Sequence, residues 1–408
     1  MVNKRRVVVT GLGVISSIGI GKEAFWKGLL DGRSGISRVD RFDTSSFETH
    51  IGGEVKHFNP EDFFDKKIVR HFGRATQFTI AASHLALADA KLAPEIIAGS
   101  SASVCLGTTM AEAQALEAVD ERTVRSGVCS GAAMRRYALQ YPSCMIATQV
   151  ASIFRLKGRA FMIPTACAAG NYSIAYGGDL IRSRKCDVVI AGGVDPFSRT
   201  AFTGFSRIFA LAPDRCQPFD KNRKGIVVGE GAGIVILESL EYAKKRGVDP
   251  YAELLGYGTS CDAHHMTIPS REGIVRAIRN ALNDAHVLSE EVDYISAHGT
   301  GTAANDRTEC AAVADVFGEK SSRIPISSIK SMLGHAMGAA SALEAIACAL
   351  VAKHDRIPPT INFETPDPNC PIDCVPNRMR ESRADIVINN SFAFGGNNAC
   401  IVLQKYKP

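Results

Sequence analysis

The sequence predicts an α/β fold with mixed sheets that are largely covered by helices. Along its 408 residues, short apolar runs end in glycine and lead into helical segments. Uninterrupted apolar runs are typical of strands buried on both faces, and their alternation with helices favours a layered α/β architecture. No linker, charge block or low-complexity segment divides the chain, and the glycine-ended strand recurs in both halves. This recurrence is consistent with a distant internal duplication.

The expected elements follow one another in a regular order. Strands are expected at 6–10, 103–106, 161–163, 187–191, 230–237, 293–296, 324–327, 386–389 and 401–404. Helices are expected at 78–90, 171–183, 274–285, 308–317 and 338–352. The last helix is rich in alanine and glycine, which predicts tight packing against another element. Gly11-x-Gly13 after the first strand lacks the third glycine of a dinucleotide-binding fingerprint, so we interpret it as a tight strand-to-helix turn.

Composition excludes several classes of protein. Hydrophobic residues make up 46% of the chain and charged residues 22%, as in an ordinary globular enzyme. The net charge of +5 argues against a dedicated nucleic-acid binder but permits a basic patch for an acidic partner. No apolar run approaches the roughly 18 residues of a membrane-spanning helix. The cysteines are scattered and no secretory signal is visible, so we expect reduced thiols and a cytoplasmic location. The Cys370/Cys374 pair lacks a second ligand pair, and we predict no metal site.

Three residues stand out as candidates for chemistry. Cys167 lies between an expected strand and an expected helix, where the helix N-terminus would stabilise a thiolate. His298 precedes Gly299-Thr300-Gly301-Thr302, and His335 follows Gly334. A cysteine combined with distant histidines is typical of covalent thioester chemistry. From these residues alone, a buried apolar cysteine and structural histidines remain open alternatives.

Neighbouring residues could support such a site. Lys330 could form a buried salt bridge with Glu309 that orients the histidines, or the two could be a plain surface pair. Gly395-Gly396 after Phe394 predicts a flexible loop with a free backbone N–H. Together with the N–H of Cys167, it could form an oxyanion hole.

The joint occurrence of Thr-Ala-Cys, Ala-His-Gly-Thr-Gly-Thr, Lys-Ser-x-x-Gly-His and Phe-Gly-Gly-x-Asn, in this order, is highly specific. With these motifs the chain resembles, over essentially its whole length, the β-ketoacyl-acyl-carrier-protein synthase II family, the elongating condensing enzymes of the thiolase-like superfamily. The resemblance implies the thiolase fold, with two similar halves in a five-layer αβαβα sandwich. Residues 1–253 would carry the nucleophilic cysteine, and residues 254–408 the histidines and the gating loop.

The resemblance also implies a reaction and a partner. Cys167 would take an acyl group from acyl carrier protein and condense it with malonyl-acyl carrier protein, releasing carbon dioxide. The chain itself would need no cofactor, because the 4′-phosphopantetheine arm belongs to the carrier protein. A homodimer is expected, without nucleic acid or membrane insertion. A coenzyme-A-dependent thiolase, an initiating condensing enzyme and a non-catalytic chain-length-factor-like partner are the alternatives, and the pathway and acyl group stay open.

Residue roles follow from the same resemblance. His298 and His335 would hold the malonyl carbonyl, with Lys330 and Glu309 as a supporting ion pair and Phe394 as the gate. The implied substrate contacts are Thr300, Thr302, Phe392, Met110, Phe205 and His265. The implied carrier-protein docking residues are Lys66, Lys67, Arg70, Arg74 and Arg207, with a solvated helix face as the alternative for the first four. Phe209 stands near the entrance where the family usually has an arginine, Met110 replaces a branched residue, and Ala393 replaces a glycine.

Overall fold

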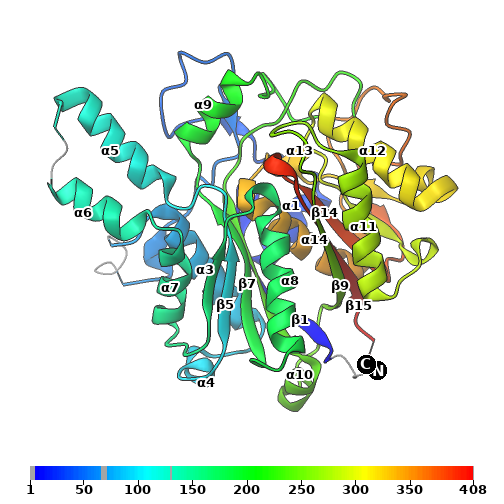
Figure 1. The fold of residues 1–408 in the computed structure, drawn as a ribbon, viewed down its shortest axis with the longest axis horizontal. Helices are drawn as coiled ribbons and strands as arrows, with labels where there is room; N and C mark the ends of the chain where they lie inside the picture. The colour runs from blue at the N-terminus through cyan, green and yellow to red at the C-terminus, as the bar shows by residue number, and fades with distance from the viewer. Residues whose placement is uncertain (1–4, 66–70, 129–130, 408) are drawn as a thin grey trace.

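The computed structural model describes residues 5–65, 71–128 and 131–407 (Figure 1). Its centre is an 11-stranded sheet with the order β11-β10-β14-β15-β9-β1-β8-β7-β5-β6, in which β2 pairs with β1. The strands of the first half are β1 (Val7–Ser16), β5 (Ser103–Gly107), β6 (Ala160–Ile163), β7 (Val188–Asp195) and β8 (Gly231–Ser239). Those of the second half are β9 (Ala252–Cys261), β10 (Tyr294–Ser296), β11 (Ile326–Ser327), β14 (Ile386–Phe392) and β15 (Asn397–Lys405).

The two halves share one topology. The order β6-β5-β7-β8-β1 repeats as β11-β10-β14-β15-β9. In each half the first two pairings are parallel and the last two are antiparallel. The halves join where Val8 and Val9 of β1 pair with Glu253 and Ala252 of β9. The predicted duplication is therefore confirmed by the strand order. The predicted boundary between residues 253 and 254 falls inside β9.

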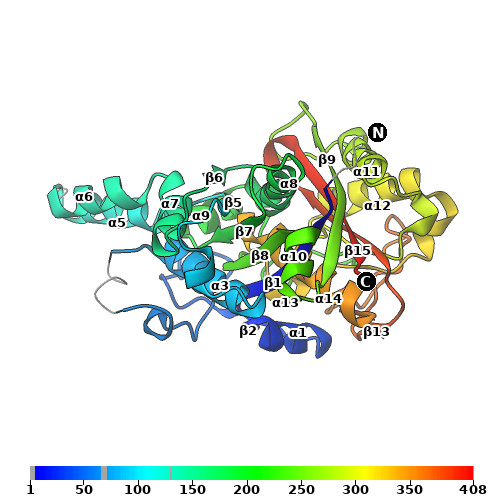
Figure 2. The same ribbon diagram turned by 90° about the horizontal axis from the view of Figure 1, so that it is seen from below.

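Helices complete five layers (Figure 2). Between the half-sheets, α8 (Ala169–Arg182) and α14 (Ala340–His354) each contact strands of both halves. The outer face of the first half-sheet is covered by α3 (Arg74–Asp89) and α7 (Cys144–Ile153), and that of the second by α11 (Arg271–Ala285) with α12 (Ala303–Phe317) beside it. The α/β class and the αβαβα arrangement are thus as predicted.

Small residues bring the two central helices together. A Cβ atom on Gly170 of α8 would lie 2.5 Å from the backbone nitrogen of Ala342 on α14, so no larger side chain fits. Residues 340–352 of α14 are all buried. The tight packing expected from the alanine-rich and glycine-rich segment is confirmed. Because α8 begins just after Cys167, this contact positions the nucleophile candidate against the second half.

The interpretation of Gly11 and Gly13 as a turn is wrong. Both lie inside β1, which continues to Ser16. A Cβ on Gly11 would lie 2.2 Å from the carbonyl oxygen of Ala86, and one on Gly13 would lie 1.8 Å from that of Ala82. The glycines therefore let the backbone of α3 approach the strand closely, a role that glycine in a strand interior commonly has.

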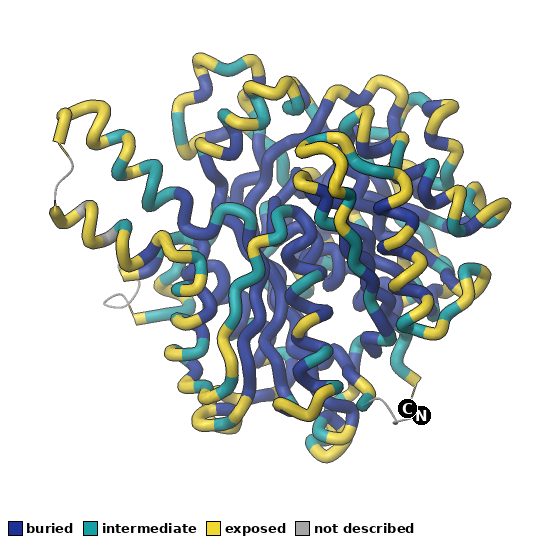
Figure 3. The backbone as a smooth tube through the Cα atoms, in the orientation of Figure 1, coloured by how far each residue is buried: buried dark blue, intermediate teal, exposed yellow. Residues whose placement is uncertain are grey.

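The remaining elements surround this core. They are β2 (Gly19–Ile20), α1 (Lys22–Leu30), β3 (Ser37–Arg38), β4 (Ile51–Gly52), α4 (Pro94–Ile97), α5 (Ala113–Ser126), α6 (Gly131–Gln140), α9 (Arg199–Arg207), α10 (Leu240–Arg246), α13 (Lys330–Leu333), β12 (Arg356–Ile357) and β13 (Arg380–Glu381). Helices α5 and α6 project from the body as an arm (Figure 1). The arm carries many exposed residues, whereas the central strands are buried (Figure 3). Within the described ranges, no helix is both long and apolar enough to cross a membrane.

Candidate active site

Three distant segments bring Cys167, His298 and His335 together. Cys167 lies between β6 and α8, His298 follows β10, and His335 follows α13. One ligand-type atom from each, the cysteine sulfur and a ring nitrogen of each histidine, all lie within 4.8 Å of one another. The three residues are 7%, 2% and 3% exposed. The convergence predicted from the motifs is therefore present, at the bottom of a cavity.

The backbone around Cys167 is held firmly. Ala166 adopts a positive φ of 50°, which is unusual for a residue other than glycine. The hydroxyls of Ser341 and Ser391 both donate to the carbonyl oxygen of Cys167, each at 3.0 Å. One serine comes from α14 and the other from β14, so both belong to the second half. The cysteine is thus presented by the first half and anchored by the second.

The groups around Cys167 shift the pKa of its thiol in opposite directions. Burial raises the pKa of Cys167 to about 11, and the Lys330 charge and the backbone N–H of Phe394 act to lower it. The buried Asp195 carboxylate raises this pKa, and the N–H of Cys167 itself lowers it. The two N–H groups that favour the thiolate are those expected to form an oxyanion hole. With this raised pKa, the thiol form of Cys167 predominates at neutral pH.

Hydrogen bonds assign one tautomer to each histidine. His335 Nδ1 accepts the backbone N–H of Met337 at 3.0 Å. His298 Nδ1 lies 3.5 Å from Lys330 Nζ, which carries only donor hydrogens. In both neutral rings the proton therefore sits on Nε2. Burial and the Lys330 charge lower both histidine pKa values well below the usual range, so both rings are neutral hydrogen-bond donors at physiological pH.

The predicted Lys330–Glu309 ion pair is wrong. Lys330 Nζ pairs with the Glu344 carboxylate on α14 and donates to the His298 carbonyl at 2.7 Å. The Glu309 carboxylate instead accepts the backbone N–H groups of His298 and Gly299, both at 2.8 Å. Glu309 on α12 thus faces the loop backbone, while the buried helix α14 brings Glu344 to the lysine. The sequence signal for Glu344 was a single acidic residue within the mostly apolar, buried stretch 340–352.

Both carboxyl groups are strongly affected by burial. Burial raises the pKa of Glu309 to about 7, although its two backbone hydrogen bonds oppose this change. Burial likewise raises the pKa of Glu344 to about 7, while the Lys330 charge and hydrogen bond act to lower it. The ionised forms therefore depend on these specific partners, which supports a role for both groups in orienting the site.

The cysteine and the two histidines could bind a transition metal by residue type and spacing. A histidine that binds a metal through Nε2 carries its proton on Nδ1 and donates it to another group. His335 shows the reverse pattern, because its Nδ1 accepts the N–H of Met337. The tautomers fit donors that face a developing negative oxygen, and they fit a metal poorly.

A cavity connects this cluster with the surface. Together with its open mouth it encloses about 560 Å³ of space between atoms. Among the predicted substrate contacts, its lining includes Thr300, Thr302, Phe392, Phe205 and His265, together with the gate residue Phe394. The lining also includes Ala393 and Gly396 of the predicted gating loop. Sequence reasoning missed the other lining residues, which are Ala210, Ile226, Asp262, Met266, Thr267, Ile268, Pro269 and Asn305.

Met110 is not among the residues that line this cavity. Its backbone N–H donates to the buried Asp195 carboxylate at 2.8 Å. The same carboxylate accepts from the Thr108 hydroxyl at 2.6 Å and from the backbone N–H of Gly338 at 2.6 Å. Asp195 thereby joins the segment that contains Met110 to the segment that follows His335.

The predicted gate is a glycine-hinged loop. Gly395 and Gly396 have φ values of 83° and 80°, a region that glycine tolerates best. The Gly395 N–H donates to the Met266 carbonyl at 2.8 Å, which joins the loop to the segment that contains His265. The Phe394 ring lies 5.8 Å from the Phe205 ring, centroid to centroid. Phe394 is 37% exposed, so its ring closes one side of the cavity mouth.

The structure places the predicted carrier-protein docking residues in different environments. Lys66, Lys67 and Arg70 lie outside the described residues. Arg74 is not a surface residue: its side chain is 13% exposed and binds Glu230 at 2.8 Å. The prediction for Arg74 is therefore wrong, because a buried carboxylate lies within reach of this position on α3. Arg207 is exposed at the end of α9.

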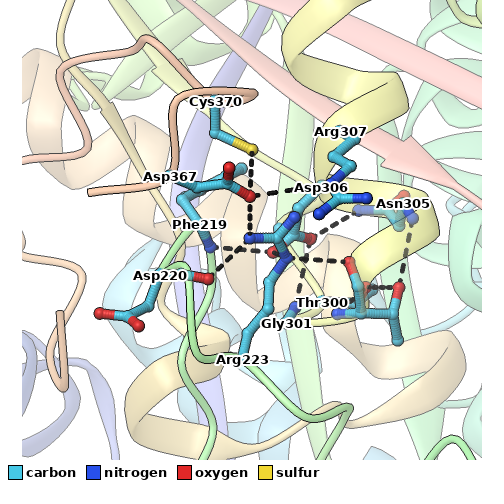
Figure 4. Close-up of polar contacts among 12 residues, drawn as sticks. Phe219, Asp220, Arg223, Thr300, Gly301, Asn305, Asp306, Arg307, Asp367 and Cys370 are labelled. Atoms are coloured by element: carbon cyan, nitrogen blue, oxygen red, sulfur yellow. Dashed lines mark hydrogen bonds and ion pairs between the residues drawn. The ribbon is translucent and has the colours of Figure 1, made fainter. Parts of the chain in front are cut away.

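A buried charged network lies behind the loop that carries Thr300 and Thr302 (Figure 4). Arg223 Nη1 donates to Asp367 at 2.7 Å, and its Nε lies 3.5 Å from Asp306 Oδ2. Asp306 accepts the N–H of Gly301 at 3.2 Å. The network thereby connects three segments of the chain. These are the segment between α9 and β8 that contains Arg223, the loop with Thr300 and Thr302 (the threonine loop), and the segment around Asp367. Sequence reasoning did not identify Arg223 as a site-supporting residue.

Comparison with known proteins agrees with this geometry. Residues 4–243 match the beta-ketoacyl synthase N-terminal domain, and residues 251–364 match the C-terminal domain. The chain is 38% identical over 417 residues to a 3-oxoacyl-[acyl-carrier-protein] synthase 2 of Synechocystis sp., covering 99% of each chain.

Solved structures with similar folds include ketosynthases of other systems. A chain of the ishigamide ketosynthase/chain length factor is 48% identical, with a TM-score of 0.95 over 99% of this chain and 100% of that chain. A type II PKS acyl-carrier protein in complex with its ketosynthase bound to the hexaketide contains a chain that is 34% identical, with a TM-score of 0.91 over 99% and 100%. The chain therefore belongs to the beta-ketoacyl synthase family.

Proposed function

We propose that this protein is a 3-oxoacyl-acyl-carrier-protein synthase that uses Cys167 as its nucleophile. The observation that carries the proposal is the buried cluster of one thiol and two neutral histidines at the bottom of an open cavity. A thiolate and preorganised donors are what acyl transfer between thioesters requires. Family membership and the 3-oxoacyl-[acyl-carrier-protein] synthase 2 relatives support the same reaction.

The first half-reaction loads the enzyme. The Cys167 thiol loses its proton as its sulfur attacks the carbonyl carbon of an acyl thioester on acyl carrier protein, and the negative charge moves to the carbonyl oxygen. The backbone N–H groups of Cys167 and Phe394 stabilise that oxyanion. The tetrahedral intermediate collapses, the carbon–sulfur bond to the phosphopantetheine arm breaks, and the carrier leaves as a thiolate that takes up a proton. The proton lost by Cys167 balances the one that the departing carrier sulfur takes up.

The second half-reaction extends the chain. A malonyl thioester binds with its carbonyl oxygen at the Nε2–H groups of His298 and His335. The bond to the carboxylate breaks, carbon dioxide leaves, and the electron pair forms an enolate that the two donors stabilise. The Phe392 ring, 5.9 Å from the His298 ring, crowds the carboxylate. The enolate carbon then attacks the acyl group on Cys167, and the cysteine leaves as a thiolate.

A second candidate concerns the pathway and the assembly. The chain shares 48% identity with a chain of a ketosynthase/chain length factor and 38% with a 3-oxoacyl-[acyl-carrier-protein] synthase 2. This difference favours a ketosynthase of a specialised lipid or polyketide pathway, paired with a second, related chain. Cys167 supports the catalytic rather than the chain-length-factor role. Homodimeric assembly and fatty acid elongation form the first candidate, and both candidates use acyl carrier protein.

Intact-protein mass spectrometry tests the proposal. The protein is incubated with a panel of acyl-acyl carrier proteins and then with malonyl-acyl carrier protein. An acyl adduct on Cys167 that is released as a 3-oxoacyl chain two carbons longer supports the proposed reaction. Absence of an adduct from every donor contradicts it. Co-expression with candidate partner chains, followed by size-exclusion chromatography, distinguishes the homodimer from the paired assembly.

A further inference from the structure

The turn that follows His335 has a strained backbone. Met337, the first residue of a short 3-10 helix (Met337–Ala339), has a φ of 50°. A residue other than glycine is disfavoured in this region of backbone space, so the conformation needs support from outside the turn. The Met337 N–H is also the group that fixes the His335 tautomer, because it donates to Nδ1 of the ring at 3.0 Å. The position of this turn therefore decides where the Nε2–H of His335 points.

A carboxylate from the first half of the fold supports the turn. Asp195, the last residue of β7, is 0% exposed. Its Oδ2 accepts the N–H of Gly338 at 2.6 Å and the N–H of Thr109 at 2.7 Å. Its Oδ1 accepts the Thr108 hydroxyl at 2.6 Å and the N–H of Met110 at 2.8 Å. All four partners donate, which is what an ionised carboxylate requires, and Oδ2 connects the two halves directly.

The backbone of the turn packs against the first half with no side chain between them. A Cβ on Gly338 would lie 2.7 Å from backbone carbon atoms of Thr108, and one on Gly193 of β7 would lie 2.2 Å from the Gly338 carbonyl oxygen. The His335 backbone is held separately, because its N–H donates to the Val227 carbonyl at 2.6 Å. Loss of the carboxylate should therefore change the orientation of the His335 ring and leave the residue itself in place.

We propose that Asp195 is a positioning residue for the malonyl half-reaction, and that it aims the Nε2–H of His335 by holding the turn after it. The inference rests on the proposed function, in which this N–H stabilises the enolate that forms when carbon dioxide leaves. The acyl-transfer step uses the backbone N–H groups of Cys167 and Phe394, which belong to other segments of the chain. The two half-reactions should therefore respond differently to a change at position 195.

The same carboxylate also acts on the Cys167 thiol through its charge. Burial raises the pKa of Cys167, the Lys330 charge lowers it, and the Asp195 charge raises it. Removal of the charge at position 195 should therefore lower this pKa and increase the fraction of thiolate at a given pH. A variant without the charge should decarboxylate the malonyl group more slowly while its cysteine reacts faster. General loosening of the fold does not predict this combination.

Two substitutions at position 195 test the proposal. Asp195→Ala leaves all four donors without their acceptor, whereas Asp195→Asn keeps the shape and one acceptor oxygen. Carbon dioxide release from malonyl-acyl carrier protein is measured in the Cys167→Ala background, where condensation does not contribute. We expect kcat for decarboxylation to fall about tenfold with alanine and about threefold with asparagine, while KM changes less than about twofold. Single-turnover acylation of Cys167, measured with the cysteine present, should stay the same or rise.

Thiol reactivity and a matched control complete the test. Alkylation of Cys167 by iodoacetamide at pH 8 should be about threefold faster in Asp195→Asn than in the unchanged protein. Asp293→Asn is the control, because the Asp293 carboxylate also accepts two backbone N–H groups, at 2.8 and 2.9 Å. Asp293 precedes β10, whereas His298 follows that strand, so the control lies at the opposite end of it. Decarboxylation, acylation and alkylation should all stay unchanged in the control.

Several results would overturn the inference. Unchanged decarboxylation in both variants at position 195 would exclude it, and an equal loss in decarboxylation and acylation would assign Asp195 a general structural role. Slower decarboxylation together with slower alkylation would do the same. If Asp195→Ala does not fold, Asp195→Asn decides alone, and no measurable loss of decarboxylation there excludes the proposal. Failure of the proposed function is distinguishable, because the unchanged protein would then form no adduct and the Cys167→Ala protein would release no carbon dioxide.

Discussion

The bottom and the mouth of the active-site cavity differ in burial and in backbone support. At the bottom, Cys167 is 7% exposed, and Ser341 and Ser391 donate hydrogen bonds to its carbonyl oxygen. At the mouth, Phe209 is 88% exposed and its backbone has a left-handed conformation. The bottom is assembled from both halves of the fold and contains buried charges with specific partners. The mouth consists of loop and helix-end residues. This difference follows from what each part does. Stabilising a developing oxyanion needs donors that do not move, and admitting a tethered substrate needs a surface that can adapt.

The largest expected effect comes from removing the nucleophile at the bottom. Cys167→Ala should lower condensation at least about a thousandfold, because no covalent acyl-enzyme can form. Malonyl decarboxylation should persist, since the histidine donors remain. Product analysis by mass spectrometry, together with measurement of carbon dioxide release, checks both expectations. Condensation that survives the substitution would exclude Cys167 as the nucleophile.

The next effect tests which carboxylate pairs with Lys330. Glu344→Gln leaves the lysine without its buried counter-ion and should lower the condensation rate about a hundredfold, with a loss of about 3 kcal/mol in the free energy of unfolding. Glu309→Gln should be milder, because the amide oxygen can still accept one of the two loop N–H groups. Steady-state kinetics and chemical denaturation of both variants check this order. The reverse order would favour the Lys330–Glu309 pair.

The pH dependence of thiol reactivity sharpens the description of the bottom of the cavity. Burial raises the pKa of Cys167 to about 11, above its usual value of 9.0, so the reactive thiolate is a small fraction at neutral pH. Alkylation of the free enzyme by iodoacetamide should therefore accelerate about tenfold per pH unit between pH 7 and 9, with no inflection at the usual histidine pKa. Peptide mass spectrometry follows the modification at Cys167. A plateau below pH 8 would contradict the raised pKa.

The smallest expected effect concerns the network behind the threonine loop. Arg223→Lys keeps the charge but loses the geometry that joins Asp367 and Asp306. We expect KM for pantetheine-bearing substrates to rise about fivefold while kcat changes little, as for a loss of positioning rather than of chemistry. The iodoacetamide rate at Cys167 serves as the internal control and should stay unchanged. A fall in kcat with unchanged KM would place Arg223 in the chemical step.

The candidate site shows which of its residues could be predicted from the sequence and which could not. From the residues alone, a buried apolar cysteine and structural histidines stayed open, and it was the family resemblance carried by the motifs that placed Cys167, His298 and His335 in one site. The roles of Thr300, Thr302, Phe392 and Phe394 followed from the same resemblance. Pairings between distant side chains were harder to predict, since they depend on which helix faces meet.

By itself the sequence determined the α/β class, the repeated strand pattern and the residue types that the chemistry needs, because apolar periodicity and glycine-rich turns are local properties. The tertiary structure alone decided that Lys330 pairs with Glu344 and that Arg74 pairs with the buried Glu230. It also decided that Gly11 and Gly13 lie inside a strand, in close contact with α3. These outcomes depend on the packing of segments far apart in the chain. Partner choice for a buried charge is set by whichever opposite charge the fold brings within reach, and the local sequence does not contain that information.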